Sequence, residues 1–208
     1  MEYIDIFPNE EKDNTVLAVS FTSEELLAMG VGEGDVDFDP LYLGKSEFSK
    51  IRNLWKDPEY LADFYEKNCE FFKDPFWEGV DEETFVQAVA DQSLLVFKEM
   101  ESLLRNGRLL TKFESLDKEN DLRRKRGKPY KIKAKGGDLS GRLLFRFYGI
   151  FLDEGTICIT GGAIKIVKEM SDAPNTEIEL KKMEIVKKDF DVNGVFDKDS
   201  FIDYVVCG

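Results

Sequence analysis

Apolar residues near the start of the chain predict a strand followed by a helix. Residues 15–21 form a short apolar run rich in β-formers, which favours a strand. Thr22 or Ser23, with Glu24 and Glu25 close behind, supplies a hydroxyl N-cap and acidic residues for a first helical turn. We therefore expect a helix directly after this strand, ending among the glycines of residues 30–34.

Helical spacing of apolar residues dominates the next part of the chain. One helix begins at Ser46 and is broken or restarted at Pro58, because proline lacks the N–H that a helix interior needs. A longer helix, with its apolar residues on one stripe, begins behind Asp81 and ends at Asn106–Gly107. A further amphipathic helix is expected over about residues 109–122.

The period of the pattern changes to two from Lys128 onward. Apolar and cationic residues alternate over residues 130–135, as in a strand with one packed face and one solvent-facing side. The elements expected after this strand are a turn at 136–141, a hairpin of strands 142–152 and 156–160, a bend at Gly161–Gly162, and an amphipathic helix over 177–188.

These elements predict an α+β fold in which an antiparallel sheet packs against helices mainly on one face. We place a loose boundary near Gly79, because the aromatic and proline-interrupted stretch before it ends there. The chain is thereby divided into an acidic, mostly helical N-terminal extension at residues 1–80 and a second domain at residues 81–208.

Composition narrows the class of protein. Of the 208 residues, 42% are hydrophobic, which is enough for a core, and no run of eighteen apolar residues predicts a membrane span. The N-terminus has no basic region followed by an apolar one, so no signal peptide is predicted. The three cysteines are scattered and form no C-x-x-C pair. We therefore expect a cytoplasmic protein without a membrane partner or a small-molecule cofactor.

The chain contains no histidine, which excludes several kinds of active site. Ser-His-Asp and Cys-His nucleophile systems, and zinc sites with histidine ligands, all require an imidazole. Any proton transfer must therefore use Asp, Glu, Lys, Tyr or the substrate itself.

Charge is distributed unevenly along this acidic chain, whose net charge is −13. Residues 1–80 carry 7 Lys and Arg against 19 Asp and Glu, whereas residues 122–146 carry 10 against one. A compact basic block is often only a solvated face, but it is also the charge pattern that binds nucleic acid. Because opposite charges attract within a Debye length, we also consider that residues 1–80 lie over the basic block and weaken RNA binding.

Several local motifs resemble one toxin family. They are Arg142-Leu-Leu-Phe-Arg-Phe-Tyr148, a turn at Asp153-Glu-Gly155, Gly162-Ala-Ile-Lys-Ile-Val-Lys168 and the helix start Pro174-Asn-Thr-Glu-Ile-Glu179. Over roughly residues 95–190 the chain is similar to the phage-related HigB branch of the RelE/HigB toxin superfamily. The expected order of elements, which is two helices, a three-stranded meander with a basic first strand, and a helix, also resembles the layout of that superfamily.

The resemblance implies a function in a toxin–antitoxin system. It implies a RelE-like meander and an mRNA interferase, a ribosome-dependent endoribonuclease whose partners are RNA or the ribosome and an antitoxin protein. Carried over to this chain, the functional cations are Lys131, Lys133, Arg142, Arg146, Lys165 and Lys168, and the late tyrosine is Tyr204. Because the family often uses a histidine, the alternative is a non-catalytic interaction protein that keeps the scaffold and binds a basic protein partner.

Residues 189–200 resemble a calcium-binding EF-hand loop. Asp189, Asp191, Asn193 and Asp197 fall at the ligand positions 1, 3, 5 and 9, with a glycine at position 6. The twelfth position, which should be a bidentate glutamate, is Ser200. We therefore favour an Asx-rich turn over a metal site.

Overall fold

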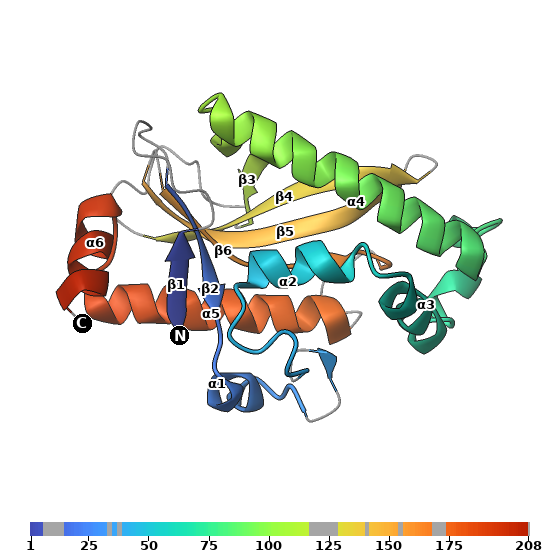
Figure 1. Ribbon diagram of the computed structural model, residues 1–208, viewed down its shortest axis with the longest axis horizontal. Helices are drawn as coiled ribbons and strands as arrows, with labels where there is room; N and C mark the ends of the chain where they lie inside the picture. Colours follow the sequence, from blue (N-terminus) through green and yellow to red (C-terminus); the bar gives the residue numbers. More distant parts are fainter. Residues whose placement is uncertain are drawn as a thin grey trace.

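The computed structural model describes residues 1–5, 15–32, 35–36, 39–116, 129–139, 142–153, 156–167 and 174–207. These residues form an α+β fold with one six-stranded, mostly antiparallel sheet, in the order β1-β2-β6-β5-β4-β3 (Figure 1). The strands are β1 (Glu2–Asp5), β2 (Thr15–Ser20), β3 (Phe113–Ser115), β4 (Tyr130–Leu139), β5 (Arg142–Asp153) and β6 (Thr156–Ile164). The helices are α1 (Ser23–Ala28), α2 (Glu47–Leu54), α3 (Pro58–Lys67), α4 (Glu82–Arg105), α5 (Pro174–Asn193) and α6 (Lys198–Cys207), with short 3-10 helices η2 (Phe71–Lys73), η3 (Pro75–Trp77) and η4 (Leu109–Lys112).

The predicted helix starts are confirmed by their caps. Thr22 precedes α1 and forms a capping box with Glu25, so each residue binds the other's backbone N–H. The side chain of Ser46 accepts from the Ser49 N–H at the start of α2, and that of Asp81 accepts from the Thr84 N–H at the start of α4. In each case the side chain satisfies an N–H group that the first helical turn leaves without a partner.

Residues 109–115 differ from the predicted helix. They form η4 and then β3, in which Phe113 is buried and pairs with Ala134 of β4. Pairing with a sheet edge therefore prevails over the local helical pattern.

The glycines expected to form a turn and a bend lie inside strands. Gly136 belongs to β4 and pairs with Phe145, and Gly161 and Gly162 belong to β6. The chain does not bend out of the sheet at Gly161; instead, the register between β5 and β6 shifts there, between Tyr148 and Gly149. A β-bulge keeps the strand in the sheet while re-aiming its side chains.

Residues 1–80 share the sheet and the core with the rest of the chain. Strand β2 pairs in parallel with β6 from Thr15–Thr156 to Ala18–Ile159, and β1 pairs with β2 on the outer side. Strand pairing therefore joins described residues on the two sides of the predicted boundary near residue 80. The sequence gives no sign of this pairing, because strand pairing between distant segments leaves no local pattern.

Helices cover both faces of the sheet, not mainly one. Helices α2, α3 and α4 pack on the face that carries Ile132, Ala134, Phe145 and Phe147, which we call the α4 face. Helices α1, α5 and α6 pack on the opposite face, which we call the α5 face; its strand residues are Leu17, Val19, Tyr148, Ile150, Leu152, Cys158 and Ala163. Figure 1 shows α4 and α5 on different sides of the strands.

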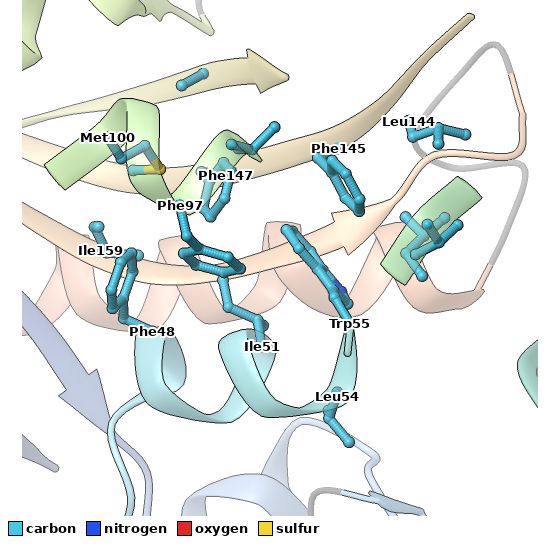
Figure 2. Packing of buried hydrophobic residues seen from close by; sticks show 14 of the residues in the cluster. Phe48, Ile51, Leu54, Trp55, Phe97, Met100, Leu144, Phe145, Phe147 and Ile159 are labelled. Carbon is cyan, nitrogen blue, oxygen red and sulfur yellow. The ribbon is translucent and has the colours of Figure 1, made fainter. Parts of the chain in front are cut away.

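An aromatic cluster joins α2, α4 and β5 on the α4 face. The ring of Trp55 stacks on that of Phe145 with centroids 4.4 Å apart, and Phe97 meets Phe147 edge to face at 5.5 Å. Figure 2 shows Ile51 of α2 and Trp55, the residue directly after that helix, pointing toward these rings. Offset and edge-to-face contacts add to the free energy of simple burial.

No helix in the described part of the chain combines the length and the apolar character that a membrane crossing requires.

Replacing Trp55 by alanine should destabilise the whole protein. Trp55 is 2% exposed, and emptying such a site costs about 3–5 kcal/mol of unfolding free energy. The measurement is urea unfolding followed by circular dichroism, with Phe76→Ala as the control, because Phe76 is an aromatic residue that is 51% exposed. If Trp55→Ala left the unfolding midpoint unchanged, residues 1–80 would not belong to the main core.

Candidate functional site

Four cations lie in register on two neighbouring strands. Every second residue of β4 is a lysine, at positions Lys131, Lys133 and Lys135. The residues that alternate with them, Tyr130, Ile132 and Ala134, are buried against the helices of the α4 face. The three lysines therefore point to the α5 face, since successive side chains of a strand alternate in direction. Arg146 of β5 stands opposite Lys135 on the same face. We call Lys131, Lys133, Lys135 and Arg146 the cationic face.

Two of these cations form a like-charged pair across the strands. Lys135 and Arg146 are direct cross-strand partners, an arrangement that destabilises a sheet by electrostatic repulsion. Glu114 of β3, which pairs with Lys133, relieves part of this repulsion. Its Oε1 lies 2.6 Å from the Nζ of Lys135 and 3.8 Å from that of Lys133. The hydrogen bond from Lys135 holds the pKa of the Glu114 carboxyl below its ordinary value.

Arg146 is the most buried member of the cationic face. It is 9% exposed, and its Nη1 donates to the backbone oxygen of Phe145 at 2.8 Å. Burial lowers the pKa of the guanidinium, but arginine remains charged at any physiological pH. A fixed, partly dehydrated guanidinium interacts with an anion more strongly than a freely solvated one.

Lys131 is the member of the cationic face that pairs with a residue of α5. It forms an ion pair with Glu184, whose carboxylate is largely exposed on that helix. The hydrogen bond from Lys131 lowers the pKa of Glu184. The cationic face is thus bordered by a carboxylate at each end, Glu184 beside Lys131 and Glu114 beside Lys135.

The structure describes the side chain of only one of the three other predicted cations, Arg142, Lys165 and Lys168. Arg142 begins β5 opposite Leu139, and its side chain lies outside the described part of the chain. Lys165 follows β6, is half-buried, and its backbone N–H donates to the Leu144 oxygen at 2.7 Å. Lys168 lies outside the described residues. The structure therefore brings together Lys131, Lys133 and Arg146 of the predicted set.

Tyr204, which the resemblance implies to be catalytic, lies in α6 and contacts Asp189 of α5. Its hydroxyl donates to Oδ2 of Asp189 at 3.0 Å, and the Tyr3 hydroxyl donates to the same oxygen at 2.6 Å. Burial and this hydrogen bond raise the pKa of Tyr204. A phenol that already donates to a carboxylate and holds its proton tightly is a poor proton donor for catalysis, so we assign Tyr204 to the attachment of β1 and α6 to α5.

The segment that resembles a calcium loop begins inside a helix, so the Asx-rich turn that we favoured from Asp189 onward is not what the structure has at residues 189–193. Asp189, Asp191 and Asn193 belong to α5, which extends five residues beyond the predicted end at Lys188, and Asp197 accepts from the Ser200 N–H at the start of α6. Two residues along a helix correspond to a rotation of about 200°, so Asp189 and Asp191 point to different sides. Asp191 accordingly pairs with Lys187, not with Asp189.

Among the described residues, no group of three or more His, Cys, Asp or Glu side chains is arranged to hold a metal ion.

Sequence reasoning missed Lys135 and Glu114 as members of the site. Lys135 continues the same alternation as Lys131 and Lys133, so the signal was present in the sequence. Glu114 could not be found in this way, because it reaches the lysines only through the pairing of β3 with β4.

Searches against protein families, curated proteins and solved structures each returned no match to this chain.

Asp189→Ala should destabilise the protein, whereas Asp191→Ala should not. Asp189 accepts hydrogen bonds from two phenols, and hydrogen bonds to a charged group contribute about 1.5–3 kcal/mol each. Asp191 loses only an exposed ion pair, a contribution of about 0–1 kcal/mol. Thermal melts of both variants, with and without millimolar calcium, measure the difference. A calcium-dependent rise in the wild-type melting temperature that both variants abolish would restore the calcium-site interpretation.

Proposed function

We propose that this chain acts on RNA as a toxin-like mRNA interferase of the RelE/HigB kind, and that the cationic face holds the phosphate backbone. The sequence resemblance supports this proposal, and so does the order of elements. From residue 82 onward, α4 comes first, then η4 and β3, then the antiparallel meander β4-β5-β6 with its basic first strand, and then α5. The antitoxin and ribosome partners implied by the resemblance are part of the same proposal.

The observation that carries the proposal is the like-charged pair of Lys135 and Arg146. A sheet gains nothing in stability from placing two cations directly opposite each other. Glu114 offsets one of the two charges, so the pair retains a net positive charge that an anionic ligand would neutralise. In the described part of the chain, the four cations of the cationic face outnumber Glu114 and Glu184, the carboxylates that pair with them. Phosphate groups fit this arrangement, because guanidinium and ammonium groups are the side chains that bind them.

The cationic face would serve one part of the cleavage reaction directly. Attack of the RNA 2′-hydroxyl on the neighbouring phosphate builds up negative charge on the phosphorane, which cations fixed on a rigid sheet stabilise. Glu114 and Glu184 are the carboxylates paired with these cations among the described residues, and the lowered pKa of each makes it a weak general base. Electrostatic stabilisation therefore contributes more to the proposed activity than acid–base catalysis by this face.

A second candidate function is a non-catalytic protein that binds a basic partner. The ion pairs of Lys131 with Glu184 and of Lys135 with Glu114 favour this alternative, because they already neutralise part of the cationic face. The strongly acidic remainder of the chain would then supply the binding surface.

Reversing the charge of Lys133 and Lys135 to glutamate should weaken binding to a fluorescently labelled single-stranded RNA by about tenfold or more and lower the salt slope by about two. The control is Lys98→Glu with Arg105→Glu, an identical change of charge at exposed positions of α4, on the other side of the sheet. Anisotropy titrations measure binding, and gel electrophoresis of the same RNA, with and without ribosomes, measures cleavage.

The outcomes separate the two functions. Equal loss of binding in both double variants would mean that only net charge matters, which contradicts a specific RNA face. RNA binding that depends on Lys133 and Lys135 without any cleavage would support the scaffold but not the interferase.

A further inference from the structure

A buried ion chain lies where β2 and β6 part. Their last pair is Ala18–Ile159, but β6 continues to Ile164. Helix α2 packs on the α4 face and α5 on the α5 face, and both contact β6. Beyond the end of the β2–β6 pairing the two helices also contact each other, through charged side chains.

Four side chains form this contact, which we call the ion chain: Lys50, Glu47, Lys182 and Glu179. Glu47 of α2 pairs with Lys50 on its own helix and accepts from Lys182 Nζ of α5 at 2.7 Å. Lys182 also donates to Glu179 Oε1 at 2.9 Å. The side chains of all four residues are at most 6% exposed. Charges buried to this extent are retained only when they are paired, since the interior does not solvate them.

Glu179 is the incompletely satisfied member of the ion chain. Its Oε2 is buried without a hydrogen-bond partner among the described residues. The same oxygen occupies the space beside Gly161, where an added Cβ would come within 1.9 Å of it. The missing side chain of Gly161 therefore makes room for the carboxylate. An ionised carboxylate with one oxygen in a dry, unpartnered position is disfavoured relative to the protonated acid.

The carboxyl of Glu179 has a pKa that is shifted toward neutrality. Burial raises its pKa to about 7, Lys182 opposes that rise, and Glu47 adds to it. From β5, Tyr148 and Arg146 face the same region: burial raises the pKa of the phenol, which stays protonated, and the guanidinium stays charged.

We propose that the ion chain is a proton-operated latch between α2 and α5, which holds the two helices more firmly when Glu179 is protonated and less firmly when it is ionised. Protonation turns the unpartnered Oε2 from a buried negative charge into a neutral hydroxyl. Lys182 of α5 donates both to Glu47 of α2 and to Glu179, so protonation of Glu179 removes a competing carboxylate from Lys182 and a like charge from beside Glu47. This inference does not depend on the proposed function.

The sign of the pH dependence follows from linkage. A carboxyl whose pKa is higher in the folded protein than in the unfolded chain takes up a proton on folding. Its contribution to stability is therefore largest below the ordinary value of 4.5 and falls as the pH rises through about 7. Above that range the contribution stays constant.

Glu179→Gln in the full-length chain tests the latch, because glutamine has nearly the same shape and cannot ionise. We expect the urea midpoint of the wild type to fall between pH 5.5 and 8.5 and that of Glu179→Gln to change much less, so that the variant has the higher midpoint at pH 8.5. The control is Glu177→Gln, an exposed residue of the same helix that pairs with Lys181 at 3.4 Å, which should retain the wild-type pH dependence. A Glu179→Gln midpoint that follows the wild-type curve would overturn the proposal.

If the Glu179→Gln variant fails to fold, the titration of the wild-type glutamate carboxyls, followed by NMR, tests the latch instead. With glutamate labelled by carbon-13 at Cδ, one carboxyl should titrate with a midpoint near pH 7, far from the exposed glutamates. If every glutamate resonance titrates below about pH 5.5, which is within the ordinary spread for this residue type, the latch does not exist.

Discussion

The parallel pairing of β2 with β6 is the constraint on which the rest of this structure depends. Parallel neighbours cannot be joined by a tight turn, so a long crossover must connect them. Here the connection between β2 and β6 contains α1 to α4 and the first strands of the meander. The pairing brings residues 15–18 into an inner position of the sheet, between β1 and β6. The aromatic cluster around Trp55 can then form only between α2, α4 and β5, because β2 and β6 place α2 there.

Much of the secondary structure could be predicted from the sequence, because it depends on local chemistry. The caps at Thr22, Ser46 and Asp81 and the alternation in β4 are short-range signals. Strand β1 gave no such signal, since its four residues are stabilised by pairing with β2. The end of α5 was also missed, because Asp189 and Asn193 suggest a loop locally. Phe190 is fully buried one turn beyond Val186, and that long-range packing extends the helix.

The part of the candidate site that depends on local sequence pattern could be predicted, and the part that depends on contacts between distant segments could not. Alternation placed Lys131 and Lys133 on one side of a strand, and the hairpin placed Arg146 on its neighbour. The carboxylates that pair with these cations belong to β3 and α5, and no local pattern connects them with β4. The ion chain was wholly invisible from the sequence, because Glu47 and Glu179 lie 132 positions apart in the numbering and meet only in the folded protein.

The identity of these carboxylates changes the role expected for the acidic part of the chain. We considered that residues 1–80 cover the basic block, but the carboxylates in contact with Lys131, Lys133 and Lys135 are Glu184 and Glu114. Five of the ten cations of that basic block, at positions 123–128, lie outside the described part of the chain. Among the described residues, these two glutamates offset part of the charge of the cationic face. Both are at least half exposed, and exposed ion pairs contribute only about 0–1 kcal/mol. A polyanion that approaches this face therefore displaces weak bonds, while the buried Arg146 keeps its position on β5. The face is thus partly neutralised in the free protein and still open to exchange of its carboxylates for phosphates.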